Sequence, residues 1–159
     1  MFIKIILCKL AIRLARLLDR DISGAGRLAE TLDGNILKKL RTRVRKDLIL
    51  VLGTNGKTTT KRLLVEIFRK EGLRAAGNSH STSEYYGILA SMMEKISILR
   101  KNKLDYLILE VKDLETLALL AELKPGYIIA TNLFREQLVR QSSYEHQLAA
   151  LSDYLKTIP

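Results

Sequence analysis

Apolar and polar residues alternate along the chain in two patterns, one typical of buried strands and one typical of helices. Strands are predicted where nearly every position is apolar, over residues 48–52, 104–111 and 127–130, with a shorter strand at 73–76. Helices are predicted where apolar residues recur every three or four positions, over residues 57–71, 83–99, 114–123 and 144–155. This alternation predicts parallel βαβ units with right-handed crossovers. The predicted fold class is therefore α/β, with a three-layer parallel sheet.

The helix predicted over residues 57–71 has an apolar face. Leu63, Leu64, Ile67 and Phe68 lie on one side of it, and we expect that side to pack on the sheet. Gly72 follows the helix and is expected to end it.

The beginning of the chain predicts a basic amphipathic helix over residues 3–20. One face would carry Lys9, Arg13, Arg16 and Arg20, and the opposite face would carry Ile3, Leu7, Leu10, Leu14 and Leu17. The favoured interpretation is that the leucine face packs on the rest of the fold; the alternative is peripheral contact with an anionic membrane surface. A spanning helix is not expected, because it needs about 20 mostly apolar residues.

Between this helix and the first strong strand, the sequence predicts short elements. Ser23-Gly24-Ala25-Gly26 predicts a turn and residues 35–40 a short helix. Residues 41–46 predict a basic connector, after which the main α/β body starts at Asp47. The chain is therefore divided into an N-terminal helical segment, 1–46, and an α/β domain, 47–159.

Charge and cysteine content limit which binding partners and which cellular compartment are expected. The net charge of the 159 residues is +10, but residues 1–46 hold twelve Lys/Arg against four Asp/Glu and so carry +8 of it. Because the folded body is nearly neutral, nucleic acid is not an expected partner. Cys8 is the single cysteine, so an internal disulfide is excluded and a reducing, cytoplasmic location is expected. A structural zinc site within the chain is not expected either.

A glycine-containing loop joins the strand at 48–52 to the helix at 57–71. Its residues are Gly53-Thr54-Asn55-Gly56-Lys57-Thr58-Thr59-Thr60. Glycines permit a tight bend and a close approach of backbone N–H groups to phosphate, and the helix start adds a partial positive charge. Lys57 can reach the β- and γ-phosphates and Thr58 can ligate Mg²⁺. The usual G-x-x-x-x-G-K-[ST] pattern would require glycine at Val51, so this is a shorter form. The loop predicts binding of ATP with Mg²⁺.

This short loop closely resembles that of the Mur ligases and folylpolyglutamate synthetases, which join an amine to a carboxylate using ATP. Two further stretches fit the resemblance, Leu107-Ile108-Leu109-Glu110-Val111 and Thr131-Asn132-Leu133-Phe134-Arg135. The pattern is most similar to the MurT-type subunit of lipid II isoglutaminyl synthase. Residues 26–29 and 35–40 also match that type, and Glu136-Gln137 stands where other Mur ligases usually have Asp-His.

The resemblance implies an ATP-dependent carbon–nitrogen ligase of peptidoglycan biosynthesis, whose central domain would be residues 47–159. ATP would phosphorylate the D-glutamate α-carboxylate of lipid II, and ammonia from a glutamine amidotransferase subunit of the GatD type would displace the phosphate. It would work in the cytoplasm, at the inner membrane face if residues 3–20 bind lipid. Lys57 and Glu110 would be catalytic, and Thr58, Glu110 and Glu136 would bind the metal. The nucleotide would contact Gly53, Thr54, Asn55, Gly56, Lys57, Thr58, Thr59 and Asn132.

Several residues depart from the family pattern near the expected metal site. Lys112 and Val139 stand where MurT-type proteins commonly have aspartate, and Glu136 carries its carboxylate one methylene further out than the usual aspartate. Ser81-Thr82-Ser83 replaces a Gly-Ala-Asn stretch on the substrate side. The loss of polar and acidic groups predicts reduced or absent turnover.

The chain stops at Pro159, before the strand with which the family would continue. The resemblance implies that a full ligase also has the rest of the central domain, a four-cysteine zinc insertion and a C-terminal domain that completes the ATP site. We therefore expect either the incomplete ATP-binding portion of a ligase or a shortened, non-catalytic ATP-binding or regulatory module. An unrelated P-loop NTPase is disfavoured, because Glu110 replaces the usual aspartate and no guanine-reading N-K-x-D follows.

Overall fold

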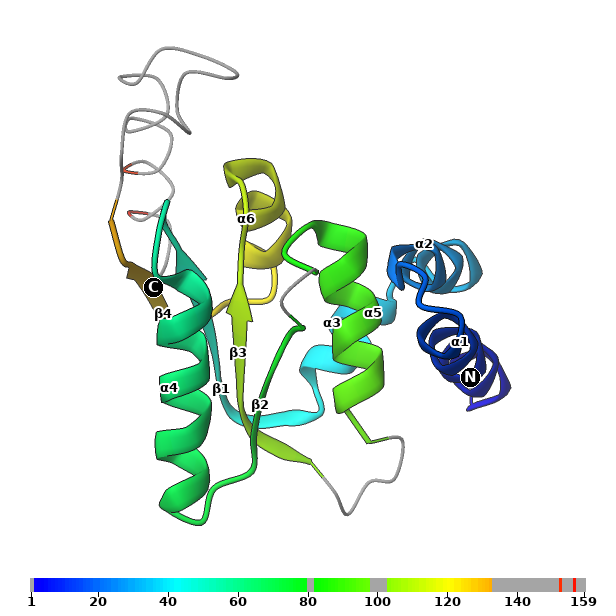
Figure 1. The fold of residues 1–159 in the computed structure, drawn as a ribbon, viewed down its shortest axis with the longest axis horizontal. Coiled ribbons are helices and arrows are strands. Elements are labelled where there is room, and N and C mark those ends of the chain that lie inside the picture. The colour runs from blue at the N-terminus through cyan, green and yellow to red at the C-terminus, as the bar shows by residue number, and fades with distance from the viewer. Residues whose placement is uncertain (1, 80–81, 98–102, 133–151, 153–155, 157–159) are drawn as a thin grey trace.

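The computed structural model describes residues 2–79, 82–97 and 103–132, together with residues 152 and 156. After three leading helices, strands and helices alternate (Figure 1). In chain order the elements are α1 (Phe2–Leu17), α2 (Ser23–Leu32), α3 (Ile36–Arg41), β1 (Val44–Leu52), α4 (Lys57–Lys70), β2 (Ala75–Gly77), α5 (Tyr85–Lys95), β3 (Leu104–Glu110), α6 (Leu114–Ala121) and β4 (Tyr127–Ala130). The helix predicted over 144–155 lies outside the described residues, apart from residue 152.

The four strands form one sheet in the order β2-β3-β1-β4, and every neighbouring pair is parallel. Leu50, in the central strand β1, lies opposite Leu109 on one side and Ile128 on the other. This arrangement confirms the predicted α/β fold with a parallel sheet. β1 begins earlier than predicted, because Val44 already pairs with Leu104. The connector predicted over 41–46 is therefore wrong in its second half, while the division of the chain at residue 46 stays a prediction.

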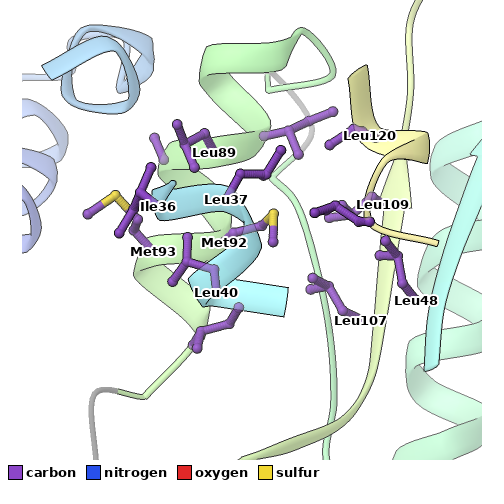
Figure 2. Packing of buried hydrophobic residues seen from close by; sticks show 14 of the residues in the cluster. Ile36, Leu37, Leu40, Leu48, Leu89, Met92, Met93, Leu107, Leu109 and Leu120 are labelled. Atoms are coloured by element: carbon purple, nitrogen blue, oxygen red, sulfur yellow. The ribbon is translucent and has the colours of Figure 1, made fainter. Parts of the chain in front are cut away.

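Helices cover both faces of the sheet (Figure 1). Alternate residues of a buried strand point to opposite faces, and β1 divides its apolar run in this way. Ile49 and Val51 join a small cluster under α4, whereas Leu48 and Leu50 join the larger cluster on the other face. Figure 2 shows that larger cluster, in which α3, α5 and α6 pack against the strands through Leu37, Leu40, Leu89, Met92, Met93 and Leu120. These are the three predicted layers.

The helix α4 packs on the sheet through a different stripe from the one predicted. Leu64, Val65 and Phe68 contact the strand cluster, and Lys61 is buried on the same side. Leu63 and Ile67 are instead 58% and 52% exposed. The prediction was wrong for these two residues because the buried face of α4 is turned toward Lys61 and Val65, which the predicted stripe did not include.

The turn predicted at residues 23–26 is wrong, because these residues form the first part of helix α2. Gly26 lies where α2 crosses α5. A Cβ atom at Gly26 would lie 2.0 Å from the backbone oxygen of Tyr86. The glycine is therefore required by a close helix–helix contact rather than by a turn.

The helix α1 docks on the fold as favoured, but by the face opposite to the predicted one. Cys8 and Ile12 are buried, with Ala11 and Ala15 packed beside them. Lys9 and Arg16, which were predicted to lie on the opposite face, anchor the helix. The Lys9 ammonium donates to the Ile96 carbonyl oxygen at 2.8 Å. The Arg16 guanidinium contacts the Glu94 carboxylate and the Ser79 hydroxyl, both at 2.8 Å. The packed face of α1 thus combines two small residues with Cys8 and Ile12.

The leucine face of α1 points away from the fold. Its described apolar residues, Ile6, Leu7, Leu10, Leu14, Leu17 and Leu18, are between 47% and 82% exposed. Within the described part of the chain, no helix has both the length and the apolar character that crossing a bilayer requires. We call this set of six residues the leucine stripe.

Candidate nucleotide and metal site

The candidate site lies at the edge of the sheet where all four parallel strands end. Gly53 follows β1, Asn78 follows β2, Glu110 ends β3, and Thr131 follows β4. Because neighbouring parallel strands run in the same direction, the polar residues at their carboxyl ends come together at one edge. The candidate residues therefore converge although up to 78 positions separate them in the chain.

The loop between β1 and α4 bends sharply at two glycines. Gly53 has φ +135° and Gly56 has φ +83°, values that side-chain-bearing residues rarely adopt. A Cβ atom at Gly53 would also lie 2.2 Å from the Thr131 hydroxyl oxygen and 2.7 Å from the Asn132 carbonyl oxygen. The loop therefore needs both the backbone freedom of glycine and its lack of a side chain.

Asn132 holds the tip of this loop. Its side-chain oxygen accepts hydrogen bonds from the backbone N–H groups of Asn55 at 2.9 Å and Thr54 at 3.1 Å. Its side-chain nitrogen donates to the Asn55 carbonyl oxygen at 3.0 Å, and the Thr131 hydroxyl donates to the same oxygen at 2.7 Å. In this structure the Asn132 carboxamide bonds to the loop, and its contact with the nucleotide stays a prediction.

The start of α4 is the part of the loop that is open to an anion. The N-cap residue is Gly56, and no side chain of the described residues caps the helix there. The first N–H groups of an α-helix have no carbonyl partner within the helix and favour a negatively charged ligand. The Lys57 ammonium lies next to them and donates to the carbonyl oxygens of Gly53 and, at 3.1 Å, of Thr54. Thr59, on the first turn of α4, is exposed.

Thr58 and Glu110 form the oxygen pair predicted to bind the metal. The Thr58 hydroxyl lies 2.9 Å from each carboxylate oxygen of Glu110, although 52 residues separate the two. The Glu110 residue is 4% exposed. A hydroxyl and a carboxylate are hard oxygen donors, and Mg²⁺ is commonly held by one or two such protein groups together with phosphate oxygens. These two residues therefore fit Mg²⁺ by the chemistry of their donors.

Lys61 belongs to the same cluster and was missed by the sequence reasoning. Its ammonium lies 2.7 Å from Glu110 Oε2 and 2.7 Å from the Asn78 carbonyl oxygen, and the residue is only 3% exposed. The available signal was its position four residues after Lys57, in line with Val65 and Phe68. A charged residue within a buried helical stripe indicates a specific partner.

Asn78 is a second residue that the sequence reasoning did not single out. Its side chain accepts from the Glu110 N–H at 2.8 Å and donates to the Glu110 carbonyl oxygen at 3.0 Å. The same side-chain nitrogen donates to the Thr82 carbonyl oxygen at 2.7 Å. These bonds fix the backbone that carries the Glu110 carboxylate. The signal in the sequence was an Asn placed directly after the end of a short strand.

The remaining predicted site residues are placed as follows. Glu136 and Val139 lie outside the described residues. Lys112 is exposed, and its ammonium contacts the Glu84 carboxylate at 2.5 Å. Among the described residues, no three His, Cys, Asp or Glu side chains group closely enough to hold a metal. A metal at Thr58 and Glu110 would therefore take its other ligands from elsewhere, such as phosphate or water.

Fold and site together define a parallel α/β domain with a glycine loop at the carboxyl edge of its central strand. A comparison with protein families gives a match to the Mur ligase middle domain over residues 51–153. This chain belongs to the Mur ligase family, which confirms the resemblance stated from its motifs.

Curated relatives and a solved structure agree with this assignment. The MurT subunit of lipid II isoglutaminyl synthase from Staphylococcus aureus (strain COL) is 28% identical over 135 residues, which cover 84% of this chain and 30% of the relative. The MurT subunit from Streptococcus pneumoniae (strain ATCC BAA-255 / R6) is 25% identical over 142 residues, covering 89% and 31%.

The solved structure of a UDP-N-acetylmuramoyl-L-alanyl-D-glutamate–2,6-diaminopimelate ligase superposes with a TM-score of 0.55 at 19% identity. It covers 94% of this chain and 29% of the solved one. It supports the fold. The chain spans about 30% of the length of the curated relatives it matches.

Proposed function

We propose that this chain is the ATP-binding portion of a Mur ligase-type enzyme that forms an amide bond. The observation that carries the proposal is the loop bent at Gly53 and Gly56, with the Thr58–Glu110 oxygen pair beside the open start of α4. Helix N–H groups and the Lys57 ammonium would bind the phosphates of ATP. Charge that develops during phosphoryl transfer would be stabilised by the same groups.

Thr58 and Glu110 would hold Mg²⁺ in this proposal. When bound, the metal would neutralise charge on the β- and γ-phosphates and so make the terminal phosphorus easier to attack. For their part, the residues of this chain fix the site in advance. Asn78 holds the Glu110 backbone and Asn132 holds the loop tip. Glu136 stays a predicted third ligand.

The reaction proposed follows the name of the curated relatives, lipid II isoglutaminyl synthase. A carboxylate of the lipid II stem peptide, the α-carboxylate of D-glutamate, would attack the γ-phosphate of ATP to give an acyl phosphate and ADP. Ammonia from a glutamine amidotransferase subunit would then form the amide and release phosphate. Loop residues of this chain would orient the nucleotide for the first step, and parts of the enzyme beyond this chain would bind the acceptor.

A second candidate function is a non-catalytic ATP-binding or regulatory module. Two lysines favour it. Lys61 pairs with Glu110, the proposed metal ligand, and Lys112 stands where the family usually has an aspartate. Both candidates require nucleotide binding. They differ in whether ADP forms when the chain is combined with the acceptor and the rest of the ligase.

Nucleotide binding is tested by titration calorimetry with ATP and Mg²⁺. We expect Lys57→Ala to weaken binding by roughly 10- to 100-fold, since it removes a charge-assisted contact worth about 1.5–3 kcal/mol. Lys70→Ala is the matched control, because Lys70 is exposed in the last turn of the same helix. Equal affinity in wild type and Lys57→Ala would contradict the proposed position of the phosphates.

We further propose that the leucine stripe of α1 lies on an anionic membrane surface. The stripe is exposed, Arg13 and Arg20 beside it are exposed too, and residues 1–46 carry a net charge of +8. Apolar residues flanked by cations bind the boundary between acyl chains and anionic headgroups. A lipid-linked acceptor would bring the enzyme to the cytoplasmic face of the membrane.

A further inference from the structure

Lys61 is buried against the carboxylate that is proposed to bind the metal. Its ammonium has two partners at 2.7 Å, Glu110 Oε2 and the Asn78 carbonyl oxygen. The side chains of Lys61 and Glu110 are only 4% and 6% exposed. Charged side chains are rarely buried to this extent unless they are paired, because removing them from water is costly. The buried Lys61–Glu110 ion pair is thus a structural part of the site.

The neighbouring strand leaves a space for the Lys61 side chain. A Cβ atom at Gly77, the last residue of β2, would lie 3.1 Å from both Cγ and Cδ of Lys61 and 2.9 Å from the Ile108 carbonyl oxygen. Glycine at this position therefore lets the aliphatic part of Lys61 pass over the end of β2. The Lys61 ammonium and the Thr58 hydroxyl both lie within hydrogen-bond distance of the Glu110 carboxylate.

This arrangement changes the charge that a metal ion would meet. Without Lys61, the Thr58–Glu110 pair would present one negative charge and two carboxylate oxygens. With Lys61, the local charge is neutral and Oε2 already accepts an ammonium hydrogen bond. Cation affinity of oxygen sites depends on the number of charged ligands, and like charges repel strongly where water is excluded. Lys61 should therefore weaken the binding of a free divalent cation.

We propose that Lys61 is a positioning residue that acts through Glu110 as an internal counter-cation of the metal site. It keeps the Glu110 carboxylate in place when no metal is bound, and it lowers the affinity for free divalent cations. Metal then binds together with the nucleotide, whose phosphates supply the missing negative charge. This inference rests on the proposed function, because it takes Thr58 and Glu110 as the metal-binding pair.

The test is calorimetric titration with Mn²⁺, in the absence and in the presence of ATP. We expect Lys61→Met and Lys61→Gln to bind Mn²⁺ without ATP at least about tenfold more tightly than wild type, because one repelling charge is gone. The matched control is Arg62→Met, which removes the same charge from the adjacent, exposed position of α4 and should titrate like wild type. Equal Mn²⁺ affinities in wild type and both Lys61 variants overturn the inference.

Thermal melting separates this role from simple packing. Loss of Lys61 leaves Glu110 as an unpaired buried charge, so the melting temperature of Lys61→Met should fall. Millimolar Mn²⁺ should restore part of that loss, by replacing the missing cation. Val65→Ala, a packing variant on the same helix face, should lose stability without metal rescue. Rescue of neither variant, or of both equally, contradicts the inference.

The two proposals fail in different ways. If the wild type does not bind ATP with Mg²⁺, the proposed function is wrong. If the wild type binds ATP but the Lys61 variants bind Mn²⁺ with the same affinities as the wild type, only the proposed role of Lys61 is wrong. The metal titration without ATP reports on Lys61 in either case.

Discussion

Individual glycines show how much a single missing side chain matters in this molecule. Gly26 lies inside helix α2, where glycine is intrinsically unfavourable by about 0.5–1 kcal/mol relative to alanine. It is tolerated because the backbone of α5 crosses at that point, so that a Cβ atom would lie 2.0 Å from the Tyr86 carbonyl oxygen. Gly24 is in the same helix and has no atom within 4 Å of the corresponding position. The two residues form a natural pair for comparison.

We expect opposite effects from the same substitution at these two positions. Gly26→Ala should lower the free energy of unfolding by about 1–3 kcal/mol, because rigid backbone must move to admit a methyl group. Gly24→Ala should raise it by up to about 0.5–1 kcal/mol through helix propensity. Urea denaturation followed by circular dichroism measures both. Similar midpoints for the two variants would show that the α2–α5 contact is looser than the structure indicates.

Sequence reasoning at the residue scale succeeded where the cause is local. Gly53 and Gly56 belong to a motif whose bend is set by a strand that leads directly into a helix, and both have positive φ. The role of Gly26 could not be inferred in this way, because glycine is required there by the backbone of Tyr86, which lies 60 positions further along the chain. Lys61 was missed for the same reason: its partner Glu110 is 49 residues away. A positively charged side chain is taken as exposed until a partner is known.

At the scale of elements, the strands were predicted well and the orientations of two helices were not. An unbroken apolar run marks a strand buried on both faces, and β1 and β3 lie where such runs are found. β4 also coincides with an apolar run, but it is an edge strand and is only partly buried. A helix can present more than one apolar face, and composition alone does not show which one packs. In α1 the packed face combines Cys8 and Ile12 with Ala11 and Ala15, while the leucines remain outside.

The docking of α1 can be followed through Cys8, the single cysteine of the chain. Burial raises the pKa of the Cys8 thiol, and only the thiolate reacts readily. We expect iodoacetamide at pH 8.5 to modify native protein at least about tenfold more slowly than urea-unfolded protein, because the helix must open first.

Two arginines of α1 supply the variants for this measurement. Arg16→Ala removes the anchor to Glu94 and Ser79 and should increase the rate of alkylation. Arg13→Ala, at an exposed position of the same helix, should leave the rate near that of wild type. If native and unfolded protein react equally fast, α1 does not dock as described.

At the scale of the whole molecule, basic charge and exposed apolar surface are concentrated at one end. In Figure 1, α1 and α2 lie on one side of the molecule, and α4 with β4 lies on the other. The candidate nucleotide site includes the start of α4, so it lies on the other side of the molecule from α1 (Figure 1).

Vesicle flotation tests the proposed membrane surface. Wild-type protein should float with vesicles that contain anionic lipid and remain below with zwitterionic vesicles. Leu10→Asp with Leu14→Asp should abolish flotation without unfolding the protein, since both residues are more than half exposed. The control pair is Leu63→Asp with Ile67→Asp, equally exposed but on α4, and it should float like wild type.

The outcomes of this experiment are distinct. Failure of the wild type to float with anionic vesicles would refute the membrane proposal. A dimer in sedimentation experiments that the Leu10 and Leu14 changes dissociate, without any flotation, would assign the stripe to a second copy of the chain. Arg16 is not used as a membrane probe, because its side chain is engaged with Glu94.

The contact between Asn78 and Glu110 has a consequence for how the site is shaped. β2 stops pairing with β3 at Gly77, yet the Asn78 carboxamide binds the N–H and C=O of Glu110 as a backbone peptide group would. The Asn78 side chain thus supplies the hydrogen bonds of one more backbone pair, beyond the point where β2 ends. The freedom that remains to Glu110 is in its side-chain torsions, so much of the entropic cost of ordering a ligand group is met during folding rather than on binding.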